Sequence, residues 1–227
     1  MRLKRAAAAI SGLVFLSLAG AGDIQPTPQG PWQPVAGYTS GAILLATRPM
    51  SGTNVHAFRA ETVVDSSLST LVAVVSDFSH LPAWMPHVAK VEETAKIDAM
   101  HSRAYVVIHS PWPLHDRDVF IDARISQDKS TGVVRVSSHS YPAGPGLQAG
   151  CVRMPEMDTD WTFTPLPDHH VKVVLRGFGL PGGVVPDWAA NLVITELPYG
   201  SLKHLPEQIG MAAYRHAHVA GISEPLH

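Results

Sequence analysis

The 227-residue sequence contains one cysteine, Cys151, and no excess of basic residues. A single cysteine excludes an internal disulfide framework and any metal site built from several cysteines. The formal net charge of -2 provides no basic surface, so we expect no nucleic-acid partner. The only long apolar run is N-terminal, which excludes a polytopic membrane protein. With 45% hydrophobic and 16% charged residues, the composition is that of an ordinary globular protein.

The N-terminal run has the three parts of an export signal. Arg2, Lys4 and Arg5 form a positive region, residues 6–18 form an apolar core, and Ala19-Gly20-Ala21 supplies a small-x-small cleavage pattern. The apolar core is too short to span ~30 Å of hydrocarbon as a stable anchor. We therefore predict a cleavable signal peptide over residues 1–21 and a periplasmic or secreted mature protein. An uncleaved N-terminal anchor is the alternative.

The mature chain divides into a leader, one domain and a tail. Residues 22–31 are rich in Pro, Gly and Gln and predict a short flexible leader, followed by a domain over 32–218 and a tail over 219–227. Apolar spacing in the domain predicts helices near 65–75 and 79–85. Alternating, β-branched segments predict strands near 32–38, 42–48, 55–64, 88–97, 103–110, 119–126, 133–140, 152–163 and 171–178.

A long amphipathic helix is expected at the end of the domain, from Pro186 to about His216, with Pro198 and Gly200 as kinks. Roughly 30 residues at ~1.5 Å rise would extend ~45 Å, enough to cover a curved sheet. We therefore predict an α+β fold, in which this helix closes a strongly curved antiparallel sheet over its concave face. The helix residues that share one face by spacing are Trp188, Leu192, Thr195, Tyr199, Leu202, Ile209 and Ala213.

The order of these elements and several local motifs resemble the START lipid-transfer domain family, which has a helix-grip fold. The Pro111–Asp118 segment resembles the P-W-P-x-x-x-R-D segment of the family. The likeness extends from about Trp32 to Met211 and rests on the order and spacing of the motifs together. The other segments that carry it are Gly41–Arg48, Phe58–Glu61, Trp84-Met85-Pro86, Val152–Trp161 and Leu180–Pro186.

The sequence departs from the family at two places. Leu180 stands where the family usually has the aspartate of D-P-G-G. Sterol-binding members often carry a buried charge pair, and the corresponding positions here are Ala123 and Ala104. Arg124 is one residue away from the basic position and, by strand alternation, faces the other side of the sheet. Recognition of a sterol hydroxyl by that pair is therefore not expected.

The strands on either side of Pro111-Trp112-Pro113 have one apolar face. The residues alone are typical of an ordinary core beneath a helix, whereas the resemblance implies that this face lines a ligand cavity. Each buried methylene contributes about 0.8 kcal/mol, so a lipid carrier needs such a water-excluding surface. The ligand-binding candidates are Val106, Ile108, Ile121 and Ala123 on this face, Met154, Trp161 and Phe163 on a later strand, and Trp188, Leu192 and Thr195 on the closing helix.

Few polar residues are candidates for chemistry. Arg117 and Asp118 are predicted either to bind a lipid headgroup or to form a structural ion pair. Trp112 either contacts a membrane or packs inward. The 13 histidines show no metal-binding spacing, and no serine lies in a nucleophile motif, so we expect no metal, no cofactor and no catalytic residue.

The sequence predicts a non-catalytic protein that binds or transports one hydrophobic ligand, a lipid, in an internal tunnel gated by the C-terminal helix. Transient membrane contact is expected through Trp112 and that helix. Two alternatives remain. Polyketide cyclases and aromatases share a related helix-grip fold, so an enzyme of that type is possible. The third hypothesis is an interaction module whose cavity is filled with side chains.

Overall fold

The computed structural model describes residues 27–38, 42–144 and 148–225. The predicted signal peptide and the first part of the leader lie outside these residues. The described end of the leader, which we expected to be flexible, contacts the domain, because Pro28 forms a β-bridge with Met50 and the Gln29 amide donates to the Pro49 carbonyl.

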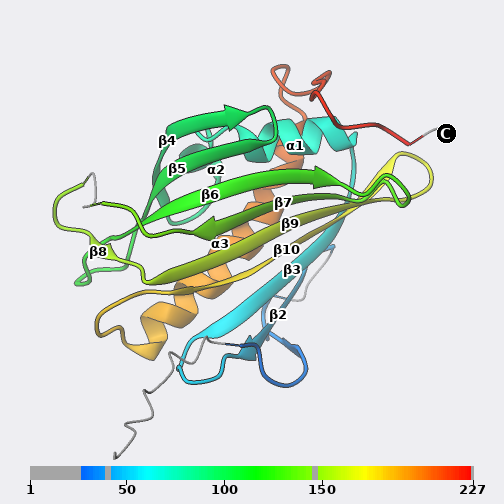
Figure 1. The fold of residues 1–227 in the computed structure, drawn as a ribbon. Helices are drawn as coiled ribbons and strands as arrows, with labels where there is room; N and C mark the ends of the chain where they lie inside the picture. The colour runs from blue at the N-terminus through cyan, green and yellow to red at the C-terminus, as the bar shows by residue number, and fades with distance from the viewer. Residues whose placement is uncertain (1–26, 39–41, 145–147, 226–227) are drawn as a thin grey trace, which may run out of the picture.

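One ten-stranded sheet forms the body of the molecule, with α3 lying across one of its faces (Figure 1). The strands follow the order β1-β2-β3-β10-β9-β7-β6-β5-β4, so the sheet stays open with β1 and β4 at its edges. The α+β helix-grip fold expected from the sequence is confirmed. The strands are β1 (Gln33–Pro34), β2 (Leu44–Pro49), β3 (His56–Asp65), β4 (Val88–Asp98), β5 (His101–Ile108), β6 (Arg117–Gln127), β7 (Val134–Ser140), β8 (Val152–Arg153), β9 (Glu156–Pro165) and β10 (His170–Leu180).

Three helices accompany the sheet: α1 (Leu68–Ser76), α2 (Leu81–Trp84) and α3 (Asp187–Ile209). Ser67 is the N-cap of helix α1, and its hydroxyl accepts a hydrogen bond from the Thr70 amide, as is typical of an N-cap serine. The Glu224 carboxylate accepts two more bonds, from the Leu68 and Ser69 amides, at 2.9 and 2.8 Å. The C-terminal segment, expected to be a tail, is therefore attached to the start of α1.

Some element bounds differ from the expectation. The strand expected over 152–163 is divided into β8 and β9 at Pro155, which has no amide hydrogen to continue the ladder. Short β8 instead pairs in parallel with the start of β6. The first strand is only two residues long, and α3 ends at Ile209 rather than near His216, since Gly210 follows as its C-cap.

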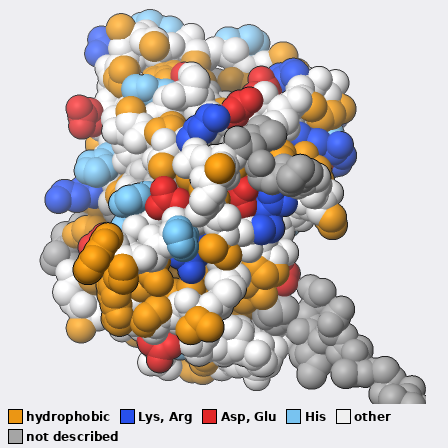
Figure 2. All heavy atoms as spheres, turned by 90° about the vertical axis from the view of Figure 1, so that its left-hand side faces the viewer, with side chains coloured by type: hydrophobic (Ala, Val, Ile, Leu, Met, Phe, Trp, Pro, Cys, Tyr) orange, Lys and Arg blue, Asp and Glu red, His pale blue; other side chains and the backbone are white. Residues whose placement is uncertain are grey.

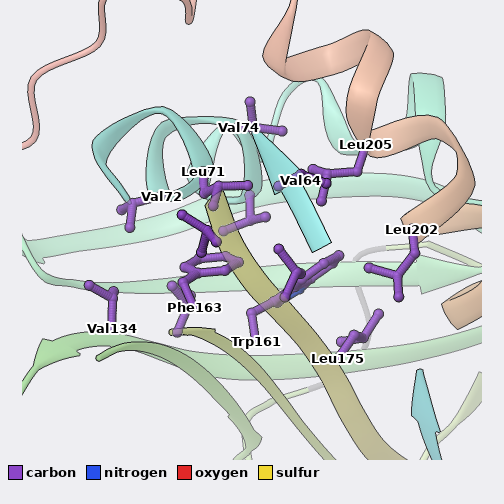
Figure 3. Packing of buried hydrophobic residues seen from close by; sticks show 14 of the residues in the cluster. Val64, Leu71, Val72, Val74, Val134, Trp161, Phe163, Leu175, Leu202 and Leu205 are labelled. Atoms are coloured by element: carbon purple, nitrogen blue, oxygen red, sulfur yellow. The ribbon is translucent and has the colours of Figure 1, made fainter. Parts of the chain in front are cut away.

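The main core lies between the sheet, α1 and the second half of α3. Figure 3 shows Trp161 and Phe163 of β9 between Leu71 of α1 and Leu202 and Leu205 of α3. The core residues of β9 are odd-numbered, because alternate side chains of a strand face the same side. This settles which side of β9 faces α3.

Leu202 is buried and Tyr199 and Ile209 pack against the main core, as expected, but the face of α3 turned toward the protein otherwise differs from the expected one. Its buried residues are Ala189, Ile194, Pro198, Gly200, Ser201, Leu202, Leu205 and Gln208. Several of these are small, and a Cβ at Gly200 would lie 2.4 Å from Cγ of Pro86. A spacing argument based on large apolar residues misses a face that is buried by close backbone approach. Trp188, which that argument placed on the buried face, is half exposed.

Candidate functional site

A cavity of about 110 Å³ lies between the first half of α3 and the sheet. It is at the end of the molecule where β5 finishes and β6 begins. Two loops contribute to it, Pro111–Leu114 from the β5–β6 connection and Pro181–Val185 from the β10–α3 connection. The lining residues are Asn54, Val55, His56, Phe58, Ile108, Ser110, Pro111, Leu114, Arg117, Met154, Met157, Thr159, Phe178, Gly179, Pro181, Val185, Ala189, Ala190, Asn191, Val193, Ile194 and Leu197.

The walls of the cavity are mainly apolar. Ile108, Val119 and Met154 belong to a buried cluster on the sheet, against which Val193 and Leu197 of α3 pack. Strand alternation places Ile108 and its cross-strand partner Arg117 on this same face. Gly179 has no side chain, which lets Met154 pack closely against it in the cavity wall. A Cβ at this position would lie 2.7 Å from Cε of Met154. The arrangement provides a surface suited to hydrocarbon rather than to water.

Arg117 is the charged exception in this lining. Its side chain is only 5% exposed. Nε donates to the Pro181 carbonyl at 3.3 Å, and Nη1 donates to the Ser110 hydroxyl at 3.2 Å and to the His115 carbonyl. Burial lowers the pKa of Arg117, and the nearby Asp116 acts in the opposite direction. The guanidinium is thus held beside both loops that contribute to the cavity.

Asp118 lies on the opposite face of the sheet from Arg117. It accepts bonds from the Tyr105 hydroxyl at 2.8 Å and from Nε of Arg153 at 2.8 Å. Burial raises its pKa, but the bonds from Arg153 and Tyr105 outweigh that effect, so the pKa lies below its usual value. Burial and the bond to Asp118 raise the pKa of Tyr105 to about 12. Asp118 therefore holds β8 against the sheet, away from the cavity.

The predicted ligand-binding residues are divided among several places. Ile108, Arg117 and Met154 line the cavity. Val106 and Ile121 belong to the same apolar cluster but lie outside the lining, and Ala123 lines a separate pocket with Met100. Trp161 and Phe163 are in the main core (Figure 3). Trp188, Leu192 and Thr195 are on α3 outside the lining, where the Thr195 hydroxyl donates to the Asn191 carbonyl at 2.7 Å.

Sequence reasoning missed several lining residues. Phe58 and Phe178 come from β3 and β10, which meet in the middle of the sheet although they are far apart in the chain. The signal for Phe58 was present, since residues 56, 58 and 60 share one face of β3. The same alternation applies to His56, but a histidine at the start of a strand is equally typical of an exposed turn, so its residue type did not indicate a lining position.

Three exposed apolar residues are neighbours in sequence of cavity-lining residues, and we call them the apolar rim. They are Trp112, Val184 and Trp188, which are 89%, 94% and 54% exposed. Each is adjacent in sequence to a lining residue, namely Pro111, Val185 or Ala189. Figure 2, which faces the end of the molecule where β6 begins, shows hydrophobic side chains gathered at its lower left. Exposed apolar side chains that gather on one part of a surface commonly mark an interaction site.

Comparison with solved structures identifies the architecture. The StAR-related lipid transfer protein of Xanthomonas axonopodis is 28% identical, with a TM-score of 0.70, and the match covers 79% of this chain and 99% of that one. This chain has the START-domain fold. The START fold of human StAR-related lipid transfer protein 5 also matches, with 14% identity, a TM-score of 0.69 and coverage of 78% and 86%. The resemblance expected from the sequence is confirmed.

Comparison of the sequence with other proteins identifies one relative of this START-fold chain, and that relative has no described function. An uncharacterized protein of Pseudomonas aeruginosa is 25% identical over 156 residues, which are 69% of this chain and 76% of that protein. No protein-family model matches the sequence. Within the described residues, no group of three or more His, Cys, Asp or Glu side chains could hold a metal ion, and no helix is long and apolar enough to cross a membrane.

Proposed function

We propose that this protein binds one hydrophobic small molecule, a lipid or a molecule like one, in the cavity beneath α3 and carries it without changing it chemically. The observation that supports this most directly is the apolar lining between Ile108, Met154 and the first half of α3. The matched X. axonopodis protein is named as a lipid transfer protein, and the structural match to it covers 79% of this chain. Burial of hydrocarbon supplies the affinity in this proposal.

Ligand binding is tested with a variant that fills the cavity. Ala190 lines the cavity from α3, so Ala190→Trp should weaken uptake of a fluorescent fatty acid by about ten-fold or more. Lys203→Trp adds the same side chain at an exposed position of α3 and should bind like the wild type. Equal binding by both variants, with both folded by circular dichroism, would contradict the proposed site.

An enzyme of the polyketide cyclase or aromatase type is the second candidate. The observation on its side is that two ionisable residues, His56 and Arg117, line the same cavity. A proton-transfer role would require His56, since Arg117 stays protonated at neutral pH. Mass spectrometry of a bound polyketide before and after incubation distinguishes the two functions. The carrier returns its ligand unchanged, whereas an enzyme yields a product that disappears in His56→Ala.

Contact with a lipid surface is proposed to occur at the apolar rim. Trp112, Val184 and Trp188 expose apolar area next to the cavity, so a ligand could pass between bilayer and cavity with little exposure to water. The double variant Trp112→Ser/Val184→Ser should sediment less with phosphatidylcholine vesicles than the wild type. Ile97→Ser is the matched control, since Ile97 is an exposed apolar residue of β4. Equal sedimentation of all three proteins would contradict the proposal.

Export through the predicted signal peptide is proposed as well. It is supported by the charged, apolar and small-residue segments at the start of the sequence. Cell fractionation with N-terminal sequencing should find mature protein that begins at Gly22 outside the cytoplasm. Recovery of protein that still begins at Met1 in the membrane fraction would favour the uncleaved anchor.

A further inference from the structure

Arg117 is a buried cation without a carboxylate partner. Other arginines of the described chain, including Arg103, Arg153 and Arg176, each form an ion pair with an aspartate. Arg117 forms none with any residue that the structure describes, although its side chain is more deeply buried than theirs. Taking a guanidinium out of water is costly unless a counter-charge or enough acceptors compensate for it.

The hydrogen bonds of Arg117 leave one side of its guanidinium free. Nε and Nη1 donate to Pro181, Ser110 and His115. Within the described part of the chain, Nη2 has no hydrogen-bond partner, which leaves two of the five N–H donors of the group unused. Arg117 lines the cavity, so these donors belong to a side chain that borders the space a ligand would occupy.

The carboxylates that flank Arg117 in the sequence are engaged elsewhere. Asp116 accepts from the Ser110 amide at 3.0 Å and lies 3.0 Å from Nδ1 of His109. Asp118 is on the other face of the sheet, paired with Arg153. The positive charge of Arg117 is therefore not neutralised by a direct contact with a carboxylate of the protein. An anionic oxygen of a ligand would neutralise it.

The size of the cavity limits the apolar part of such a ligand. A group the size of a water molecule needs about 10–15 Å³ of cavity volume. A cavity of about 110 Å³ therefore accommodates on the order of ten groups the size of a methylene. The lining beyond Arg117 is provided by apolar residues such as Met154, Val193 and Ile194. The space thus suits a short hydrocarbon chain with one polar end.

We propose that the ligand is an amphiphile with an anionic head, a carboxylate or a phosphate, which is bound by the free side of the Arg117 guanidinium, and with an apolar tail of about ten carbons in the cavity. This inference rests on the proposed function, because it names the class of molecule that the same cavity takes. A charge-assisted hydrogen bond to an arginine in an apolar site should tighten binding by about 10- to 100-fold.

Four ligands with the same tail test this inference on the delipidated mature protein: decanoate, decyl phosphate, decanol and methyl decanoate. Calorimetry should show at least one of the anions binding about ten-fold or more tightly than decanol and methyl decanoate. Tightening by decanoate alone assigns a carboxylate, and tightening by decyl phosphate alone assigns a phosphate. Equal affinity of all four would overturn the inference while supporting the proposed function, and binding of none would overturn both.

Variants then assign the preference to the residue. Arg117→Met should lose the preference for the anion over decanol, and Arg117→Lys should recover part of that preference. Arg124→Met removes an exposed arginine from the opposite sheet face and should keep the preference in full. If Arg117→Met is unfolded, the wild-type comparison of charged and neutral ligands still decides the inference. A folded Arg117→Met that prefers the anion as strongly as the wild type would contradict it.

Discussion

Asp122 interacts with three positively charged or protonatable side chains at once. Its carboxylate lies 2.9 Å from Nε2 of His101, 3.0 Å from Nε of Arg103 and 2.9 Å from Nε of Arg124. Burial raises its pKa, but the bonds from His101 and Arg103 and the charge of Arg124 outweigh this and lower the pKa to about 2. The folded protein therefore favours the ionised form more strongly than the unfolded chain does.

The contribution of Asp122 should be visible in the pH dependence of the free energy of unfolding. Because the folded pKa is below the unfolded value of 3.8, the stabilisation is complete above about pH 4 and is lost as the pH falls toward 2. We expect it to contribute about 1–2 kcal/mol, since both arginines are partly exposed. Urea unfolding between pH 7 and pH 2.5 should therefore show a smaller loss in Asp122→Asn than in wild type. The exposed Asp65→Asn is the control, and parallel curves for all three proteins would contradict the expectation.

At the scale of elements, α3 depends on a residue without a side chain. A Cβ at Gly200 would lie 2.4 Å from the ring of Pro86, which cannot move without its backbone. Although alanine usually stabilises a helix relative to glycine, Gly200→Ala should lower the free energy of unfolding by about 1–3 kcal/mol. Gly210→Ala is the control, since its nearest contact would be 3.4 Å. Chemical denaturation measures both, and a gain in stability for Gly200→Ala would show that Pro86 gives way.

Helix α1 depends on a residue 156 positions away. The Glu224 carboxylate accepts bonds from two amides of its first turn, where a negative charge also interacts favourably with the helix dipole. Glu224→Ala should lower the free energy of unfolding by about 1–2 kcal/mol. Glu207→Ala, at an exposed position of α3, should change it by less than about 0.5 kcal/mol. Denaturant titrations would contradict the assignment if the two variants were equally stable.

The strand pattern made most elements predictable, but not the contacts among distant ones. Alternation along β5 and β6 was sufficient to place Ile108 on an inner face, because it depends only on neighbours in sequence. The cap on α1 could not be found in this way, since Glu224 and Leu68 are brought together by the whole fold. Trp161 was expected in the apolar wall of the ligand site but lies in the core, because the part of the sheet that stays open depends on how the helix crosses it.

At the scale of the whole molecule, the two halves of α3 have different surroundings. The first half borders the cavity through Ala189, Val193 and Ile194, whereas the second half is packed in the core through Leu202 and Leu205. Regions with fewer packed contacts open at lower free-energy cost. Amide hydrogen exchange should therefore be faster over residues 187–197 than over 198–209.

Ligand should reduce this difference. A bound hydrocarbon chain fills the space against residues 187–197, so their exchange should slow while that of 198–209 stays almost unchanged. The exposed end of β4 provides an internal reference that no ligand should affect. Uniform exchange along α3 in the free protein would contradict the expected difference in stability between its two halves.

Four of the five tryptophans form two pairs that report on different parts of the protein, while Trp32 is partly buried with Arg48 over its ring. Trp84 and Trp161 are buried with ring centroids 6.4 Å apart, whereas Trp112 and Trp188 are exposed beside the cavity. A water-soluble quencher such as iodide should reach the second pair and not the first. Emission that becomes protected from iodide therefore signals that something has covered the outer pair, without any label attached to the chain.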